Sequence, residues 1–562
     1  MQEIFKDCAQ ELYYVSQLIT ELTGEKSSLN NTLDKLVLQM GGNIDTDGDG
    51  TPDKDYGGFA SKPRNVTKDL GNFKTNLSSL GTWMLDIKSQ TLTIESFYVY
   101  TADQKLPRAE SNWFKQAWFS IRGFFASFFF DYQAIGVTNE GGFEREIEVW
   151  FLTSADSGRE QANVVKSLID QYFIYDTQVY KNFECNVILK VLAAGVLLPA
   201  TLAGTGPDVA INVDGGLPVN YALRGAIYNL AEQPDFVDAV LERFTLPGSG
   251  ITKIEDVNVM VPYEFNGGYY GFPNNISYLV MFYRKDIFDE NNWEVPTTWK
   301  EVIDLVTELQ VSNLDFYLPL EGAGSQIYAT ILYQMGGQFY TDDHKACDFS
   351  TEVAKKAFEQ WCSYFCDYSF ELAASFTNRF RSGEMPIGIA SFTLYNTLAV
   401  FAPDIAGKWA FAPLPGYVNE DGELVNKGAL GSSAMVVMKA SKDYEASWDF
   451  VKFWSSTDIQ TKFSQEIESI LGSGARHNTA NINAMMNLAW NNEELEILIP
   501  QFQNAFGVPE VPGGYYISRN LENAIREVIN NDSDERETLA EYVELINSEI
   551  TRKRQEFGLP TA

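Results

Sequence analysis

The sequence is poor in the residues on which most catalytic and metal chemistry depends. It contains two histidines and five cysteines in 562 residues. Neither His344 nor His477 has a serine or cysteine nucleophile in a recognisable setting. No Gly-x-Ser-x-Gly elbow, phosphate loop or His-Glu-x-x-His pattern occurs. These absences argue against the corresponding enzyme classes. A pair of acids for glycoside hydrolysis stays open, because 76 Asp and Glu residues could supply it.

The cysteines are odd in number and widely scattered, at Cys8, Cys185, Cys347, Cys362 and Cys366. Cys362 and Cys366 could share one helix face, but no second cysteine pair accompanies them, which argues against zinc. Free cysteines in folded proteins are usually buried. We therefore expect buried thiols.

Basic residues are also scarce, with 42 Lys and Arg against 76 Asp and Glu and a net charge of −34. Such a charge argues against nucleic acid as a partner and against docking of the folded body on anionic lipid. The most apolar run, from Gly123 to Phe130, is too short for a membrane span. The first residues contain no signal peptide, and Cys8 follows Lys6 and Asp7, unlike a lipidation site. We expect this start to be a boundary inside a longer protein.

The first part of the chain is predicted to be helical. Apolar residues recur every three or four positions in four stretches, the first of which ends at Gly24 and the second at Gly41-Gly42. Their stripes are Phe5, Cys8, Leu12, Val15, Ile19 and Leu22; Leu33, Leu36, Val37 and Met40; Leu70, Phe73, Leu77, Leu80 and Met84; and Trp113, Trp118, Ile121, Phe125 and Phe128. We interpret the stripes as packing surfaces.

An acidic loop interrupts these helices. Asp45-Thr-Asp-Gly-Asp-Gly-Thr-Pro-Asp53 places carboxylates at alternate positions around a glycine, which matches a calcium loop. We predict a structural Ca²⁺ bound by Asp45, Asp47, Asp49 and Asp53. The twelfth position, where a bidentate Glu belongs, is Tyr56, so an acidic surface loop is the alternative. No cofactor is expected for function.

From Glu146 onward, strands alternate with helices. Strands are predicted at Ile147–Leu152, Cys185–Val191 and Asp208–Asn212, with helices at Gly158–Phe173 and Ala193–Gly204. This alternation favours βαβ units and a parallel sheet. Ligands of such sheets bind beyond the carboxyl ends of the strands. The loops Thr153–Arg159 and Asn212–Gly216 are therefore predicted to lie at the binding edge.

Several segments in this part resemble one known family. They are Val149-Trp-Phe-Leu, Gly204-Thr-Gly-Pro-Asp-Val-Ala-Ile, Gly271-Phe-Pro-Asn, Phe282-Tyr-Arg-Lys-Asp-Ile-Phe, Val295-Pro-Thr-Thr-Trp-Lys-Glu-Val, Arg379-Phe-Arg-Ser-Gly-Glu-Met-Pro-Ile-Gly-Ile and Ser432-Ser-Ala-Met-Val-Val. In this order they resemble family 1 extracellular solute-binding proteins, the maltose-binding-protein-like group. The resemblance covers about residues 146–558.

Three further segments resemble a large, multi-part subgroup from Gram-positive bacteria. They are Gly472-Ser-Gly-Ala-Arg-His-Asn-Thr-Ala-Asn481, Val508-Pro-Glu-Val-Pro-Gly-Gly-Tyr-Tyr516 and Arg554-Gln-Glu-Phe-Gly-Leu559. The resemblance implies an α/β, two-lobed fold of the periplasmic-binding-protein class II type, whose lobes close on a small ligand. Crossings are expected at Pro273, Gly431–Ser433 and Leu471–Gly472. The expected parts are a helical extension at 1–143, lobe one at 144–275 plus 432–470, and lobe two at 276–431 plus 471–562.

The resemblance also implies which side chains face the ligand. By position these are Asp156, Arg159, Asn212, Asp214, Asn275, Glu321, Gln326, Tyr395, Tyr515, Tyr516 and Arg519. At Asn274-Asn275 the sequence departs from the carboxylate that the maltose-binding group has there. If Tyr515 and Tyr516 stand on an extended segment they point to opposite sides, and we then expect Tyr516 to meet the ligand.

The implied function is capture of a carbohydrate, an oligosaccharide in our interpretation, for import through the membrane subunits of an ABC transporter. The implied setting is extracellular, on a surface-anchored lipoprotein that works as a monomer, with no enzymatic activity. Three alternatives stay open: a non-sugar solute such as a peptide or a modified sugar acid, a glycan-cleaving enzyme, and a surface adhesion protein that has lost transport.

Overall fold

The computed structural model describes residues 2–24, 26–46, 48, 51–89, 117–122, 134–137, 143–153, 158–174, 183 and 185–561. The chain divides into two compact units, one formed by Met1–Pro107 with Ser375–Ser382 and the other by Arg108–Ala374 with Gly383–Ala562. Among the described helices, none combines the length and apolarity that crossing a bilayer requires.

The first unit is built around the helices α1 (Gln2–Thr23), α2 (Ser28–Met40) and α4 (Val66–Ser89), with a short α3 (Gly58–Ser61). The apolar stripe predicted for the second stretch is confirmed: Leu33, Leu36, Val37 and Met40 are buried on α2. On α1 the prediction is partly wrong. The buried residues are Ala9 and Ser16, and Leu22 is 77% exposed. The Ser16 carbonyl oxygen accepts a hydrogen bond of 2.7 Å from Asn30 Nδ2, so polar groups face the neighbouring helix where the pattern predicted apolar contact.

Lobe one of the second unit contains the predicted parallel strands. β4 (Arg145–Leu152) lies between β5 (Cys185–Leu192) and β6 (Val209–Asp214) and is parallel to both. The crossover segments include α6 (Gly158–Leu168), which continues as a π-helical turn (Ile169–Ile174), and α7 (Leu197–Leu202). β3 (Ala134–Val137) pairs antiparallel with β5. The sheet therefore begins inside the stretch that the sequence assigned to a helical extension.

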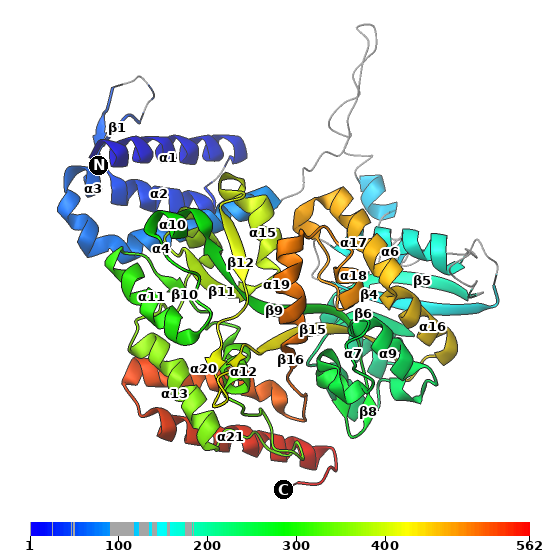
Figure 1. Ribbon diagram of the computed structural model, residues 1–562. Coiled ribbons are helices and arrows are strands. Elements are labelled where there is room, and N and C mark those ends of the chain that lie inside the picture. The colour runs from blue at the N-terminus through cyan, green and yellow to red at the C-terminus, as the bar shows by residue number, and fades with distance from the viewer. Residues whose placement is uncertain are drawn as a thin grey trace. The chain divides into compact units, whose positions relative to one another are not determined.

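Two long strands connect the lobes (Figure 1). β9 (Phe272–Arg284) and β15 (Gly428–Val437) pair antiparallel, with Ile276 opposite Ser432, and form the middle of a 10-stranded sheet. In lobe one β15 pairs with β6, and in lobe two β9 lies between β11 (Ile387–Ser391) and β12 (Trp409–Ala412). Because β6 and β11 run in opposite directions along this sheet, the carboxyl ends of each lobe's strands face the other lobe.

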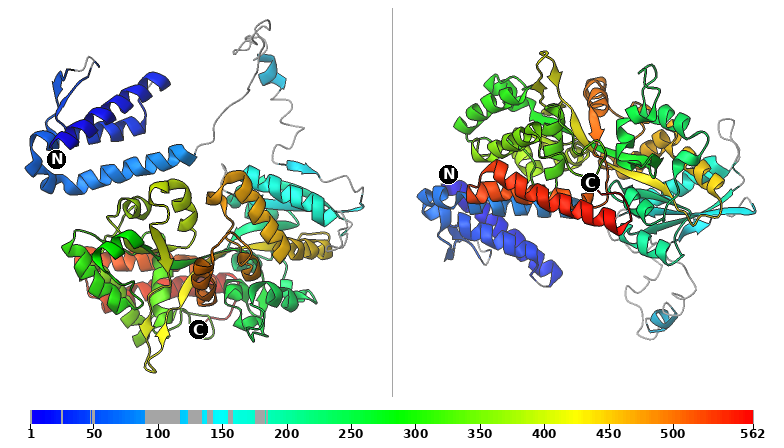
Figure 2. Two further views of the ribbon diagram at one scale, coloured as in Figure 1. Left: turned by 45° about the horizontal axis from the view of Figure 1, so that its top comes forward. Right: turned by 90° about the horizontal axis from the view of Figure 1, so that it is seen from below.

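Helices and two separate two-stranded sheets surround this sheet. In lobe one they are α8 (Pro218–Leu223), α9 (Phe236–Phe244), α16 (Tyr444–Ser455), α17 (Thr457–Leu471), β7 (Glu264–Phe265) and β8 (Gly268–Tyr269). In lobe two they are α10 (Lys285–Asn291), α11 (Trp299–Val311), α12 (Gly324–Gln334), α13 (Glu352–Cys366), α15 (Leu394–Phe401), α19 (Asn492–Gln503), α20 (Ile517–Asn531), α21 (Glu535–Glu556), β13 (Tyr417–Val418) and β14 (Leu424–Val425). The sheet itself also includes β10 (Phe316–Tyr317), which pairs with β11, and β16 (Ala505–Gly507), which pairs with β15. Figure 2 shows α20 and α21 side by side at the red end of the chain.

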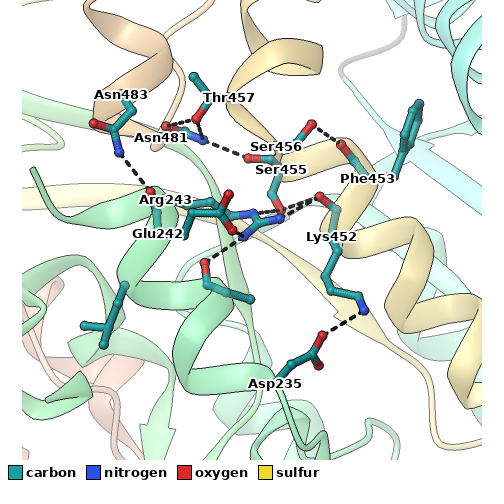
Figure 3. A network of polar contacts seen from close by, with 12 residues as sticks. Asp235, Glu242, Arg243, Lys452, Phe453, Ser455, Ser456, Thr457, Asn481 and Asn483 are labelled. Carbon is teal, nitrogen blue, oxygen red and sulfur yellow. Dashed lines mark hydrogen bonds and ion pairs between the residues drawn. The ribbon is translucent and has the colours of Figure 1, made fainter. Parts of the chain in front are cut away.

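The chain after Gly472 stays attached to lobe one for longer than the sequence indicated. Asn483, in α18 (Ile482–Met485), donates to the Glu242 carbonyl at 2.8 Å, and Asn481 donates to the Ser455 carbonyl at 2.9 Å (Figure 3). In the same network Arg243 Nε donates to Ser455 Oγ at 2.9 Å. These bonds attach α18 to α9 and α16, whereas the predicted boundary assigned it to lobe two.

The five cysteines are free thiols. Cys185, Cys347 and Cys362 are buried, as predicted, and burial raises the pKa of the Cys347 thiol to about 12. For Cys8 and Cys366 the prediction is wrong, since both are exposed. Cys366 belongs to the last turn of α13, where it lies off the buried face of that helix.

Candidate functional site

A polar cleft lies where β4 and β6 end beside the crossing strand β9 and helix α15. Its volume is about 430 Å³. We call it the asparagine cleft. The lining residues are Phe151, Gln161, Asn212, Asn274, Asn275, Thr393, Asn396, Thr397, Trp454, Phe463, Ile467, Gly474, Ala475, Arg476, His477 and Asn478.

Three asparagine side chains in this cleft hold one another in a fixed orientation. Asn212 Oδ1 accepts from Asn274 Nδ2 at 2.6 Å and from Asn275 Nδ2 at 3.0 Å. Asn212 Nδ2 donates to the Leu152 carbonyl at 3.2 Å, and Trp454 Nε1 donates to Asn274 Oδ1 at 2.9 Å. Because the Leu152 carbonyl can only accept and the indole can only donate, each amide has one possible orientation. Asn212 has a φ of 64°, a conformation that asparagine adopts more readily than most residues.

Arg476 extends the cleft toward lobe two. It is 7% exposed, and it forms two hydrogen bonds with the Glu468 carboxylate, of 2.7 and 3.1 Å. Its guanidinium lies 4.5 Å from the ring centroid of Trp490 and 5.2 Å from that of Tyr395. Such a pair of aromatic contacts fixes a guanidinium strongly. The backbone carbonyl of Arg476 accepts from Asn396 Nδ2 at 2.8 Å, which also fixes the Asn396 amide.

The cleft is close to electrically neutral. Burial lowers the pKa of His477 to about 4, so its imidazole is uncharged at neutral pH. The His477 Nε2 lies 2.9 Å from Gln460 Oε1. Among the described residues that line the cleft, Arg476 alone carries a charge, and Glu468 compensates it.

Three buried polar atoms of this cleft have no hydrogen-bond partner in the described part of the chain. They are Asn275 Oδ1, Asn396 Oδ1 and Arg476 Nη1. Native proteins satisfy almost all buried polar groups, so atoms of this kind indicate where a ligand or an ordered water binds.

A second, larger cleft of about 690 Å³ uses the loop after β6 together with α12 and α20. We call it the carboxylate cleft. It is lined by Leu198, Asp214, Gly215, Gly216, Leu217, Asn220, Tyr221, Arg224, Pro262, Ser325, Gln326, Phe339, Tyr340, Ala429, Leu430, Gly431, Ser432, Val508, Glu510, Gly514, Tyr515, Ile517, Ser518 and Lys553. In Figure 1, α15 and α17 lie above the crossing strands, whereas α12, α20 and α21 lie below them.

Two acids from different lobes face each other in the carboxylate cleft. Asp214 is the last residue of β6, and its Oδ1 accepts a hydrogen bond from the Gly216 amide at 3.1 Å. Glu510 lies in the segment before α20. Its burial, together with the negative charge of Asp214, raises the pKa of the Glu510 carboxyl to about 8. The structure thus brings two acidic side chains to the same cleft, and the Glu510 carboxyl keeps its proton at neutral pH.

The residues predicted to form one site are divided between these clefts. Asn212 and Asn275 line the asparagine cleft, and Asp214, Gln326 and Tyr515 line the carboxylate cleft. Tyr395 packs beneath Arg476. Glu321 forms an ion pair with Arg526 at 3.0 Å. Tyr516 and Arg519 line neither cleft. Arg159 is in the first turn of α6. Asp156 lies outside the described residues.

The two tyrosines do not stand on an extended segment, so that premise was wrong. Gly513 has a φ of 89°, and a 3₁₀ turn follows at Gly514–Tyr516. Tyr515 is 58% exposed, lines the carboxylate cleft and donates its hydroxyl to Glu549. The glycines therefore present Tyr515 to the cleft, where the sequence favoured Tyr516.

Sequence reasoning missed Asn396, Arg476, His477 and Glu510 as cleft residues. Arg476 and His477 stand in the Gly472–Asn481 segment and Glu510 in the Val508–Tyr516 segment, both of which carried the resemblance. Their place in quoted motifs was the available signal. For Asn396, the available signal was that the adjacent residue, Tyr395, was itself predicted to face the ligand.

The acidic loop is described only in part. Asp53 accepts from Thr46 Oγ1 at 2.7 Å, and Asp45 accepts from the Gly48 amide at 2.7 Å. Strands β1 (Asn43–Ile44) and β2 (Lys54–Asp55) pair at its base. Asp47 and Asp49 lie outside the described residues. Within the described ranges no group of three or more His, Cys, Asp or Glu side chains is placed to hold a metal, so the calcium site stays a prediction.

Comparison with known proteins now defines the class. A sequence model of the family described as bacterial extracellular solute-binding protein matches residues 194–474. The chain belongs to this bacterial extracellular solute-binding protein family, whose members bind solutes.

Among its relatives, the arabinooligosaccharide-binding protein of Halalkalibacterium halodurans is 24% identical over 277 residues, which are 42% of this chain and 57% of the relative. The match thus spans little more than half the length of that relative. Among solved structures, the sugar-binding protein MalE of Xanthomonas citri has a TM-score of 0.59 at 18% identity and covers 74% of this chain and 100% of its own. The cyclic alpha-maltosyl-1,6-maltose binding protein of Arthrobacter globiformis has a TM-score of 0.57 at 19% identity, and the match covers 72% of this chain and 99% of that protein. These likenesses establish the two-lobed α/β fold.

Proposed function

We propose that the chain captures a neutral carbohydrate, an oligosaccharide, in the asparagine cleft and delivers it to the membrane subunits of an ATP-driven importer. The observation that carries the proposal is the set of unpartnered polar atoms at Asn275, Asn396 and Arg476. Two proteins similar to this chain are named for binding an arabinooligosaccharide and cyclic alpha-maltosyl-1,6-maltose, which supports the same ligand class.

The hydrogen-bonding capacity of these atoms selects among ligand classes. The two amide oxygens accept and the guanidinium nitrogen donates. A pair of sugar hydroxyls can donate to both oxygens and accept from the nitrogen. A carboxylate has only acceptors, so it would leave Asn275 Oδ1 and Asn396 Oδ1 unsatisfied. A sugar acid has hydroxyls as well, but its carboxylate would add an uncompensated negative charge, because Glu468 already pairs with Arg476. The neutral cleft therefore favours a sugar over the sugar acid.

The test is calorimetric titration of a sugar found by thermal-shift screening of a glycan panel. A ligand at 100 times its dissociation constant adds about 2.7 kcal/mol to stability, which such a screen detects. Removing one neutral hydrogen bond costs about 0.5–1.5 kcal/mol, so Asn396→Ala should weaken binding about two- to tenfold. Asp214→Asn, in the other cleft, is the matched control and should leave affinity unchanged. Equal affinity of Asn396→Ala and the parent would place the sugar elsewhere.

Glycan cleavage is the alternative function, because Asp214 and Glu510 line the same cleft and the pKa of Glu510 is raised, as it is for the general acid of a glycosidase. We propose binding without cleavage, supported by the family to which the chain belongs. Incubation with labelled oligosaccharides distinguishes the two. Smaller products that disappear in Glu510→Gln would establish the enzyme.

We further propose that the protein acts as a monomer and is held at the surface of a Gram-positive cell by a lipoprotein anchor. The extracellular family supports the location, and the resemblance of the Gly472–Asn481 segment supports the group of bacteria. Light scattering of the purified chain and metabolic lipid labelling of the full-length protein in cells test these statements.

A further inference from the structure

Residues 117–122 form a short helical stretch that presents large apolar side chains to solvent. Trp118 is 68% exposed, Phe119 77% and Ile121 51%. The sequence pattern predicted packing surface for Trp118 and Ile121, and these exposures contradict it. Three large apolar side chains exposed within four residues form a patch of the kind that marks an interaction surface.

The sequence segment that contains this stretch has a net charge opposite in sign to that of the whole chain. Residues 105–122 contain four basic residues, Lys105, Arg108, Lys115 and Arg122, and one acidic residue, Glu110, which gives a local charge of +3. The complete chain carries −34. The same stretch of sequence also contains Trp113 and Phe114. Positive charge combined with Trp and Phe is typical of segments that lie at a bilayer surface, where the rings enter the headgroup region and the bases meet anionic lipid.

We propose that residues 117–122 bind the surface of an anionic bilayer by inserting Trp118, Phe119 and Ile121. This contact would hold the binding protein beside a membrane-embedded importer, in addition to any covalent anchor. It requires no membrane span, in agreement with the described helices. The net charge of −34 opposes the approach of a second copy and of an anionic surface alike. Exposed charges farther away than a Debye length of about 10 Å are screened, so the basic residues next to this stretch in the sequence decide the attraction at the bilayer. The proposal is independent of which cleft holds the ligand.

The experiment is co-sedimentation of the full chain with vesicles of phosphatidylcholine alone and of phosphatidylcholine with 30% phosphatidylglycerol. We expect binding to the anionic vesicles, at least tenfold weaker in Trp118→Ala/Phe119→Ala and reduced in Arg122→Glu and at 0.5 M NaCl. Leu22→Ala is the matched control, since Leu22 is also 77% exposed, and it should bind like the parent.

A second readout locates the inserted ring. Brominated lipid should quench tryptophan fluorescence of the parent on anionic vesicles, and Trp118→Phe should lose that quenching. The proposal is overturned if the parent does not sediment with anionic vesicles, or if the double variant binds as well as the parent. It is also overturned if the patch instead drives self-association, seen as a dimer in sedimentation velocity that the double variant abolishes.

Discussion

Replacing the cleft acid Glu510 by glutamine should stabilise the protein at pH 8.5 and leave its stability nearly unchanged at pH 4. Burial and the charge of Asp214 raise the pKa of Glu510 from 4.5 to about 8. The folded protein therefore keeps this proton up to about pH 8, whereas the unfolded chain releases it near pH 4.5. Because the unfolded state binds fewer protons in this window, the free energy of unfolding falls as pH rises through it. Glutamine does not ionise, so the Glu510→Gln variant should not lose stability in this way as pH rises.

The size of the effect follows from the difference between the pKa of Glu510 in the unfolded chain and its pKa in the folded protein. Each tenfold change in the acid constant is worth about 1.4 kcal/mol, so a rise from 4.5 to about 8 corresponds to roughly 4–5 kcal/mol. Glu510 keeps some contact with solvent in the cleft, and the amide needs its own hydrogen bonds. We therefore expect about 1–3 kcal/mol at pH 8.5. Asp214, Tyr263 and Tyr340 lie near Glu510, and Tyr221, Arg224, Tyr515 and Lys553 also line the cleft. Tyr263 and Tyr340 stay neutral because burial raises their pKa.

Urea unfolding of the parent and Glu510→Gln between pH 4 and 9 measures the difference directly. Asp214→Asn is the companion variant. It removes the repelling charge, lowers the pKa of Glu510 and should reduce the dependence on pH. A gap between parent and Glu510→Gln that is the same at pH 4 and pH 8.5 would refute the reasoning, because a merely structural effect of the substitution does not follow the titration.

Three further predictions follow from other parts of the structure. If the loop Asp45–Asp53 binds calcium, chelator should lower the melting temperature and Asp47→Ala should abolish that response; calorimetry without a heat of calcium binding would contradict it. Ligand should close the lobes and reduce the radius of gyration in small-angle scattering, and an unchanged radius at saturation would count against a hinge. Glu468→Gln should destabilise the protein by about 3–5 kcal/mol in urea, because it leaves Arg476 buried without its counter-charge. The exposed ion pair of Lys300 and Asp304 should contribute far less, so a Glu468 variant as mild as Asp304→Asn would contradict the burial argument.

The strands of lobe one could be predicted because their pattern depends on local rules. β4, β5 and β6 are short apolar runs buried in a sheet, and runs of this kind are recognisable without knowledge of their neighbours. The helix end at Gly24 could also be predicted, because a φ of 79° favours glycine. On α1 the prediction failed because the neighbouring helix determines which residues are buried. Ser16 is buried because Asn30 from α2 donates a hydrogen bond to its carbonyl, and the apolar periodicity of α1 contains no information about that contact.

The candidate site could be predicted only as a set of loops. The rule that ligands lie beyond the carboxyl ends of strands located Asn212 and Asp214 correctly at the end of β6. It could not show that these two residues, two positions apart, line different clefts. Arg476 could not be found by residue type, since a buried arginine is recognised only once Glu468, Trp490 and Tyr395 are seen around it.

The asparagine cleft is also part of the connection between the lobes, so a ligand bound there would contact the strand about which we expect the lobes to close. Asn275 stands on the crossing strand β9, and the chain that returns after α17 lies along the same strand: Ile276 donates to the Asn478 carbonyl at 2.9 Å, and Ala480 donates to the Asn274 carbonyl at 2.9 Å. A sugar hydroxyl bound to Asn275 Oδ1 therefore contacts the strand about which the lobes would rotate. A ligand shifts such an equilibrium only by the difference in its contacts between the two states. Asn396, on α15 of lobe two, could supply that difference, since rotation moves it relative to Asn212 of lobe one.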